Sequence, residues 1–226
     1  ITVNLGGVVN GSVTTWNGSV SLDGSAVSTT LATLARATGE TVSGSPYNIT
    51  GVTFNALAGT AASNYTLANS FSATPTLSIT AKALTASIAD QTKIYGANDP
   101  SLAGITVNLG GVVNGSVSTW NGSVSLDGSA VSTTLATLTR AVGETVSGSP
   151  YNITGVTFNA LAGAAAANYT LANSFSATPT LSITAKALTA SIADQTKIYG
   201  ANDPTLSGIT VNLGGVVNGS VTTWNG

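Results

Sequence analysis

The chain has 226 residues, with six basic and eight acidic side chains and a formal net charge of −2. It contains no Cys, His or Met, which excludes disulfides, zinc–thiolate sites, Cys nucleophiles and Ser–His–Asp triads. A net charge of −2 does not favour nucleic-acid binding by neutralisation of phosphates. No apolar run approaches the roughly 20 residues of a membrane span. We therefore expect no enzyme, no cofactor or metal, and neither a nucleic-acid partner nor insertion into a membrane.

The sequence repeats itself with a period of 104 residues. Residues 1–104 recur at 105–208, and residues 209–226 begin a third copy. The two full copies differ at seven positions, all of them exchanges among small or β-branched residues that leave every charge in place. This period is too long for one turn of a solenoid and matches a whole small domain. We therefore expect an array of near-identical modules.

Counted as modules, the middle copy spans residues 82–185 and the third begins at 186. This middle copy opens with the pattern of a strand followed by a turn. Leu84, Ala86 and Ile88 alternate with the residues between them, which predicts a half-buried strand. The stretch 93–100, Lys-Ile-Tyr-Gly-Ala-Asn-Asp-Pro, has strong turn chemistry. The structural turn motif predicted here, with its copy in the third repeat, comprises Tyr95, Gly96, Asp99, Pro100, Tyr199, Gly200, Asp203 and Pro204.

The next segment predicts a strand at 105–109 and then a meander. Three dipeptides, Asn114-Gly115, Asn121-Gly122 and Asp127-Gly128, are typical of type I′ hairpin turns, which need positive φ angles. We expect them to bracket short strands at 116–120 and 123–126.

The remainder of the repeat predicts further strands. The leucines of 131–142 have helical spacing, but its threonines favour a strand, which we expect here with a short helix as the alternative. The alternation changes parity across Thr154-Gly155, which predicts a β-bulge. The last strands are expected at 168–171 and 178–183.

These patterns predict an all-β fold: tandem small antiparallel β-sandwich or β-grasp-like modules in a rod-like array. We expect a complete module at 82–185, an incomplete one at 1–81 that lacks its opening strands, and the opening strands of a third at 186–226. The missing initial Met indicates an excerpt of a longer chain. Incomplete modules would be completed by a neighbouring chain or by continuation of the same polymer.

The order of motifs resembles a known repeat family. The motifs are the turn at 93–100 after the strand at 82–85, then Tyr151-Asn152-Ile153, Asn168-Tyr169-Thr170 and Leu181-Ser182-Ile183-Thr184. Together they resemble the MBG/YDG-type repeats of large bacterial surface proteins such as filamentous-haemagglutinin-like adhesins. The chain departs from that pattern after Asn114-Gly115, where Ser116 follows instead of an acidic residue. The resemblance implies a β-rich spacer or stalk module without catalytic residues.

The few charges of the middle repeat suggest no metal site. Its four acids, Asp90, Asp99, Asp127 and Glu144, lack the spacing of a calcium loop. We expect Asp99 to cap its own turn and Asp127 to lie in its turn. A less favoured alternative is a covalent crosslink between an Asn and a lysine beside a buried acid such as Glu144. The lysines concerned are Lys82, Lys93 and Lys186.

Two further residue types are candidates for modification or binding. Asn-x-Ser/Thr sequences make Asn114, Asn121, Asn152 and Asn168 candidate glycosylation acceptors. The tryptophans Trp16, Trp120 and Trp224 each precede an Asn-Gly pair and are candidate contacts for a ligand or partner. The simpler reading is that each Trp covers the end of its own small core.

The sequence thus favours a secreted or cell-surface bacterial protein with a structural role. It predicts either an adhesin stalk or a component of a self-assembling extracellular fibre or biofilm matrix. Expected partners are other copies of the chain, joined laterally or end to end by strand complementation, and in addition glycans or the surface of a host or neighbouring cell. The alternative is a carbohydrate-binding module that uses the Trp-Asn-Gly hairpins.

Overall fold

The computed structural model describes all 226 residues and is mostly β, with several small antiparallel sheets and four short 3₁₀ helices. No helical segment has the length and apolar character needed to cross a membrane. The chain forms two compact units that interleave along the sequence. Unit 1 contains 1–82, 113–130 and 164–169, and unit 2 contains 83–112, 131–163 and 170–226.

Unit 2 contains a four-stranded sheet in the order β11-β12-β14-β7 and a three-stranded sheet in the order β13-β6-β8. The pair β14–β7 is parallel, whereas β11–β12 and β12–β14 are antiparallel. The elements assigned mainly to this unit are β6 (Lys82–Ser87), β7 (Gln91–Ile94), η2 (Leu102–Gly104), β8 (Asn108–Gly110), β11 (Leu135–Arg140), β12 (Tyr151–Phe158), β13 (Tyr169–Leu171), β14 (Thr180–Thr184), β15 (Thr189–Ile192), η4 (Leu206–Gly208) and β16 (Val211–Gly214).

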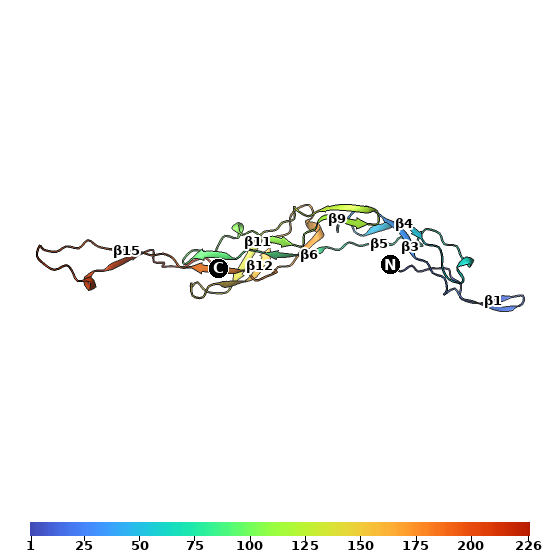
Figure 1. Cartoon of the computed structure of the whole chain (residues 1–226), viewed down its shortest axis with the longest axis horizontal. Coiled ribbons are helices and arrows are strands. Elements are labelled where there is room, and N and C mark those ends of the chain that lie inside the picture. The colour runs from blue at the N-terminus through green and yellow to red at the C-terminus, as the bar shows by residue number, and fades with distance from the viewer. The chain divides into compact units, whose positions relative to one another are not determined.

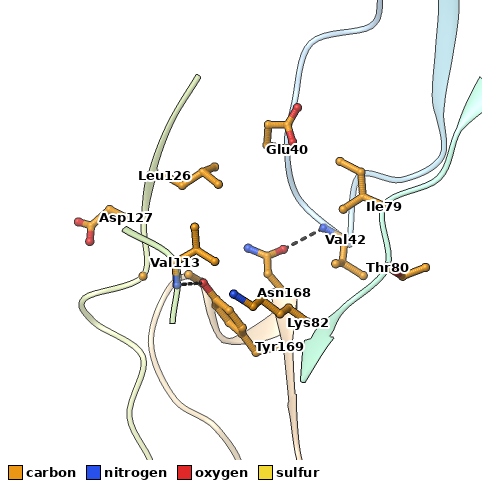
Figure 2. A pocket seen from close by; sticks show the side chains of 12 residues that line it. Glu40, Val42, Ile79, Thr80, Lys82, Val113, Leu126, Asp127, Asn168 and Tyr169 are labelled. Atoms are coloured by element: carbon orange, nitrogen blue, oxygen red, sulfur yellow. Dashed lines mark hydrogen bonds between the residues drawn. The ribbon is translucent and has the colours of Figure 1, made fainter. Parts of the chain in front are cut away.

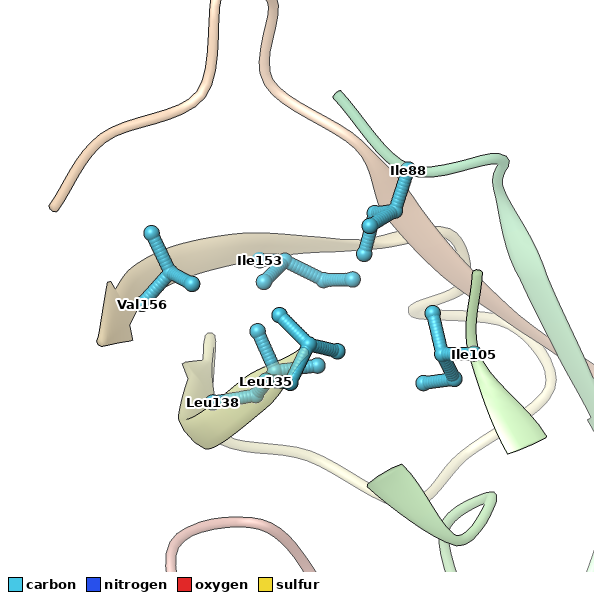
Figure 3. Close-up of a cluster of buried hydrophobic side chains, with 6 residues drawn as sticks. All are labelled: Ile88, Ile105, Leu135, Leu138, Ile153 and Val156. Carbon is cyan, nitrogen blue, oxygen red and sulfur yellow. The ribbon is translucent and has the colours of Figure 1, made fainter. Parts of the chain in front are cut away.

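The core of unit 2 lies between the sheet β11–β12 and the opening segment of the repeat. Ile88 and Ile105 point toward side chains of β11 and β12 (Figure 3). The cluster consists of Ile88, Ile105, Leu135, Leu138, Ile153 and Val156. Burial of each such side chain stabilises the fold by about 1.5–3 kcal/mol, so the opening strands contribute directly to the stability of β11 and β12.

Several expectations from the sequence are confirmed in unit 2. The alternating residues Leu84, Ala86 and Ile88 are all buried on one side of the chain at β6. The ambiguous stretch 131–142 contains a strand, β11, and no helix. The predicted bulge is present. Thr139 pairs with Gly155 and the next residue, Arg140, pairs with Ile153, so Thr154 has no partner in the ladder.

Unit 1 contains the three-stranded sheet β3-β4-β5 and the hairpins β1–β2 and β9–β10. Strands β3 and β4 repeat the register of β11 and β12, with Arg36 opposite Ile49. The strands of this unit that Figure 1 labels are β1, β3, β4, β5 and β9. Its elements are β1 (Gly11–Thr15), β2 (Gly18–Leu22), β3 (Leu31–Arg36), β4 (Tyr47–Phe54), η1 (Ala62–Asn64), β5 (Thr76–Leu77), β9 (Asn114–Thr119), β10 (Gly122–Asp127) and η3 (Ala166–Asn168).

The hairpin β9–β10 corrects the expected turns. Asn114 and Asp127 pair with each other in the ladder, so neither lies in a tight turn, and the single hairpin turn is formed by Trp120 and Asn121. No residue other than glycine has a positive φ, whereas a type I′ turn would need one at Asn121. Gly122, with φ 109°, supplies the left-handed residue after the turn.

The compact units do not coincide with the segment 82–185. The hairpin β9–β10 of the second repeat belongs to unit 1, which holds most of the first repeat. Residues 217–226, which begin the same hairpin of the third repeat, belong to unit 2. Each compact unit therefore combines the sheet of one repeat with the Trp-Asn-Gly segment of the following repeat.

Candidate docking site for the tryptophan turn

The turn motif of one repeat binds the tryptophan turn of the next within unit 2. Asp99 donates its backbone N–H to the Thr222 carbonyl at 3.0 Å, and Thr222 donates its own N–H to Asn98 Oδ1 at 2.8 Å. The Asp99 carboxylate accepts the Trp224 N–H at 3.0 Å, and the Trp224 indole N–H donates to the Pro100 carbonyl at 2.9 Å. The Gly-Ala-Asn-Asp-Pro turn is therefore a receptor for residues 222–224.

The glycine of the turn allows the close approach of the docked segment. Gly96 has a φ of 83°, which L side chains rarely adopt. A Cβ atom at this position would also lie 2.5 Å from Cγ2 of Val217, which is too close for two carbon atoms. Gly200, its copy in the third repeat, has the same backbone conformation (φ 85°) but open space around it. Gly96 thus meets a conformational need and a packing need at once.

The residue after the tryptophan binds the edge of β11. The Asn225 side chain accepts the Arg140 N–H through Oδ1 at 3.0 Å and donates from Nδ2 to the Arg140 carbonyl at 2.8 Å. Both backbone groups of Arg140 are thus satisfied by one amide side chain. The indole of Trp224 meanwhile packs against the hydrophobic core.

Beneath the docked turn lies a cluster of four buried or half-buried charges. Lys93 Nζ lies 2.7 Å from Asp99 Oδ1, and Arg140 Nε lies 2.8 Å from Asp99 Oδ2, with all three side chains no more than 2% exposed. Glu144, 30% exposed, pairs with Arg140 and lies 2.7 Å from Lys93. Its Oε2 is buried and close to the ammonium but not aligned to accept a hydrogen bond from it. Two acids and two bases leave the cluster neutral.

Asp99 is ionised in this cluster. Burial raises the pKa of its carboxyl, but hydrogen bonds from Arg140 and Lys93, together with the Trp224 N–H, outweigh burial and hold that pKa below its usual range. Burial lowers the pKa of Arg140, and the Asp99 and Glu144 carboxylates outweigh it and raise that pKa. The expectation that Asp99 only caps its own turn is therefore wrong, because its carboxylate joins the turn motif, β11 and the following repeat.

Arg140 is the central residue of the site. Its remaining guanidinium nitrogen, Nη1, donates to the carbonyls of Ala141 and Gly143 at 3.1 and 2.7 Å. The guanidinium lies over the Tyr151 ring, 5.4 Å from the ring centroid, which adds a cation–π contact. The Tyr151 hydroxyl is held in turn by the backbone of Thr145. These contacts fix the edge of β11 to which Asn225 binds.

Unit 1 contains the Asn–Arg contact of this docking site but not the part formed by the turn motif. Asn121 accepts the Arg36 N–H at 3.1 Å and donates to the Arg36 carbonyl at 2.6 Å. Arg36 is buried and pairs with Glu40, but unit 1 contains no counterpart of Asp99 or Pro100. Trp120 is accordingly 40% exposed, and Trp16, which docks on no sheet, is fully exposed.

A second contact between successive repeats lies beside this site in unit 1. A pocket of about 180 Å³ is lined by residues of both repeats, including Glu40, Val42 and Asp127 (Figure 2). Asn168 Oδ1 accepts the Val42 N–H at 2.8 Å across it. The Tyr169 hydroxyl accepts the Val113 N–H at 3.0 Å, which ties the base of the hairpin to its own repeat. The hairpin is therefore held at its tip and at its base.

The candidate glycosylation acceptors are placed differently from one another. Asn121 and Asn168 use their side-chain amides to hold the backbone of the preceding repeat, and Asn114 accepts the Gly128 N–H at 2.8 Å. Asn152 is exposed on β12. Asp127 is the last residue of β10 rather than a turn residue as expected, and its carboxylate accepts the N–H and hydroxyl of Ser129 in the turn that follows.

The copy of the turn motif in the third repeat is not assembled. Tyr199 is fully exposed, and the Lys197–Asp203 pair is 50% and 82% exposed.

The sequence patterns did not indicate Arg140 or its position beneath the docked turn. One feature of the sequence could have pointed to Arg140: each repeat has a single arginine and a single glutamate, and they lie four residues apart. No three Asp or Glu side chains form a group that would hold a metal ion.

Comparison of the chain with protein-family models, with curated proteins and with solved structures gave no match.

Proposed function

We propose that this chain is a structural repeat region of a secreted or cell-surface bacterial protein, where it acts as an adhesin stalk or as part of a self-assembling extracellular fibre. One observation carries this proposal. The turn motif and arginine of one repeat bind the Trp-Asn-Gly turn of the next, through Asp99, Arg140 and Asn225. The most specific motifs of the sequence are thus used to connect repeats.

The proposed architecture is a rod-like array of β-sandwich or β-grasp-like modules. Each module would consist of the opening strands and second half of one repeat, together with the hairpin of the following repeat. This connection resists bending better than a flexible linker, because two segments of the following repeat hold the preceding one: Asn121 of the hairpin bonds Arg36, and Asn168 bonds Val42. A stalk that extends a distant binding region needs this stiffness.

The composition supports an extracellular setting. Only 14 charges, six basic and eight acidic, occur in 226 residues, so the surface is polar mainly through hydroxyls and amides. Such a surface repels its neighbours weakly and allows modules or chains to lie side by side. The absence of Cys and Met also removes the residues most sensitive to oxidation.

Carbohydrate binding by the tryptophan hairpins is the weaker candidate. In unit 2 the Trp224 indole already donates to Pro100 and packs on the core. A glycan would therefore compete with the contact that connects the repeats. If a variant with Ala at Trp16, Trp120 and Trp224 keeps its glycan binding, measured on a glycan array, this candidate is removed.

The proposal is tested with arrays of two, four and six repeats. Small-angle scattering should show a maximum dimension that grows by a constant increment for each repeat. An array with Ala at every position equivalent to Asn121 should be more flexible, whereas Ala at every position equivalent to the exposed Asn152 should leave the scattering unchanged. Antibodies against the array should label intact cells that carry the protein. Arrays that stay compact, or labelling that requires permeabilised cells, would contradict the proposal.

A further inference from the structure

The amide that connects one repeat to the next belongs to an Asn-Gly pair, the dipeptide in which asparagine is chemically least stable. Asn121 is followed by Gly122, and Asn225, which makes the same contact in unit 2, is followed by Gly226. Glycine has no side chain beside its backbone nitrogen and reaches more backbone conformations than any other residue. That nitrogen can therefore approach the side-chain carbonyl carbon of the preceding asparagine.

The reaction open to such a pair is deamidation. The backbone nitrogen of Gly122 attacks Cγ of Asn121, so a new C–N bond forms and the bond from Cγ to Nδ2 breaks. Ammonia leaves with the proton of the Gly122 N–H, and a succinimide ring remains. Water then opens either C–N bond of the ring and gives aspartate or isoaspartate. No electrons are exchanged, and water is the only co-reactant. Asn121 is exposed at the surface, so water reaches it.

The docked geometry opposes this reaction at Asn121. Its Oδ1 accepts the Arg36 N–H at 3.1 Å, and its Nδ2 donates to the Arg36 carbonyl at 2.6 Å. Ring closure requires Cγ to turn toward the Gly122 nitrogen and Nδ2 to depart, and both steps break these bonds. Asn121 should therefore react when the tip of the hairpin has left the edge of β3, and local opening of this kind is a normal fluctuation of a folded protein.

The product of the reaction cannot restore the contact. An aspartate at position 121 has a second oxygen where Nδ2 was. One oxygen can still accept the Arg36 N–H, but the other faces the Arg36 carbonyl, so two acceptors meet and the carbonyl loses its donor. Arg36 is 5% exposed, which makes a lost partner costly. Isoaspartate adds one carbon to the main chain of the turn and moves the side chain away as well.

We infer that Asn121 is a deamidation site controlled by docking, and that the contact between repeats is lost irreversibly when it stays open. A hairpin tip that remains docked keeps its amide, whereas a tip that opens is converted to an acid that does not return to Arg36. Asn225, which holds Arg140 through the same two bonds, is the equivalent site in unit 2. The inference goes beyond the proposed function, because it applies to a stalk and to a fibre alike. An array of repeats would lose its stiff connections one by one with age.

The rate of deamidation in the wild-type chain tests the control by docking. The 226-residue chain is incubated at mildly alkaline pH, both folded and unfolded in guanidinium chloride, and the products at each asparagine are followed by peptide mass spectrometry. Two hydrogen bonds must break before Asn121 reacts, so its rate should be at least about tenfold lower in the folded chain than in the unfolded one. Equal rates in the two states would overturn the inference.

Asn17 is the internal control for the geometry of the turn. Thr15 contacts Asn17 and Gly18 in the same way as Thr119 contacts Asn121 and Gly122, but the side chain of Asn17 holds no arginine backbone. In the folded chain Asn17 should therefore deamidate at least about tenfold faster than Asn121. If both react equally slowly, the turn itself gives the protection and docking does not control the site.

A variant that carries the product tests the irreversible step. Asn121→Asp should lower the ratio of folded to unfolded chains at least about fivefold in urea unfolding. Asn48→Asp is the matched control, because it makes the same change from amide to acid at an exposed position of β4 in the same unit. It should leave the curve unchanged. If Asn121→Asp is as stable as the wild-type chain, a deamidated tip can dock again and the inference is wrong.

The inference and the proposed function fail in different ways. If Asn121→Ala leaves unfolding by urea unchanged, the connection between repeats is wrong and the proposed function fails. If Asn121→Ala destabilises the chain but wild-type Asn121 deamidates equally fast in the folded and unfolded states, the connection stands and only the inference fails.

Discussion

Asn225 and Arg140, 85 residues apart, share two hydrogen bonds in which one side-chain amide satisfies both backbone groups of the other residue. Because the same pair recurs between Asn121 and Arg36, this amide is the most regular contact between one repeat and the next.

Replacement of this amide should destabilise unit 2. Asn225→Ala leaves the N–H and carbonyl of Arg140 without their partner, which costs about 1–3 kcal/mol. Urea unfolding followed by circular dichroism measures the change. Asn17→Ala is the matched control, because the side chain of Asn17 holds no arginine backbone, and it should leave the curve unchanged. Equal effects of the two substitutions would show that Asn225 does not dock as described.

Removal of Asp99 should be more severe. Asp99→Ala leaves Lys93 and Arg140 buried without this carboxylate, and loss of one partner of a buried ion pair costs about 3–5 kcal/mol. The docked Trp224 also loses the acceptor of its N–H. Chemical denaturation should show the loss in unit 2. The substitution Asp194→Asn, at an exposed position, should have no such effect.

Asp99 should also make stability depend on pH. The pKa of its carboxyl is lowered in the folded state, so the stabilisation is fully present above the unfolded pKa of about 3.9 and is lost as pH falls through the lower folded value. The difference in free energy of unfolding between wild type and Asp99→Asn should therefore be constant near neutral pH and shrink below about pH 4. A difference that stays constant down to pH 2 would contradict the buried ion pairs.

Alanine substitutions at Gly96 and Gly200 should distinguish the cost of backbone strain from the cost of a steric clash with the docked segment. Gly96→Ala and Gly200→Ala impose the same unfavourable positive φ, which costs roughly 1–2 kcal/mol. Only Gly96→Ala also collides with Val217. We expect Gly96→Ala to weaken docking of 217–226, seen as faster hydrogen exchange at Trp224, whereas Gly200→Ala should leave that exchange unchanged.

The tryptophans should report docking directly. Trp224→Phe keeps an aromatic ring but removes the indole donor to Pro100, which costs about 1 kcal/mol. Trp16→Phe should be neutral because Trp16 is fully exposed. Acrylamide quenching of chains that retain only one tryptophan should rank accessibility as Trp16 above Trp120 above Trp224 in dilute solution. Equal quenching at all three would contradict the docked turn.

Local patterns in the sequence were sufficient to locate several of the strands. The alternation at Leu84, Ala86 and Ile88 reports one buried face, because side chains in a strand point alternately to opposite sides. The parity change at Thr154-Gly155 located the bulge for the same reason. Composition alone, through the absence of Cys and His, excluded disulfides and sites built on a thiolate or an imidazole.

Contacts between repeats were decided only by the tertiary structure. Asn17, Asn121 and Asn225 have identical neighbours, so no local pattern distinguishes the docked copies from the exposed one. The Asp99–Trp224 contact joins residues 125 positions apart. The buried charges were equally hidden, because the sequence presents Lys93, Asp99 and Arg140 as ordinary polar residues. They become a neutral buried cluster only when the turn motif, β11 and the next repeat bring opposite charges together, since ionic groups leave water only when they are paired.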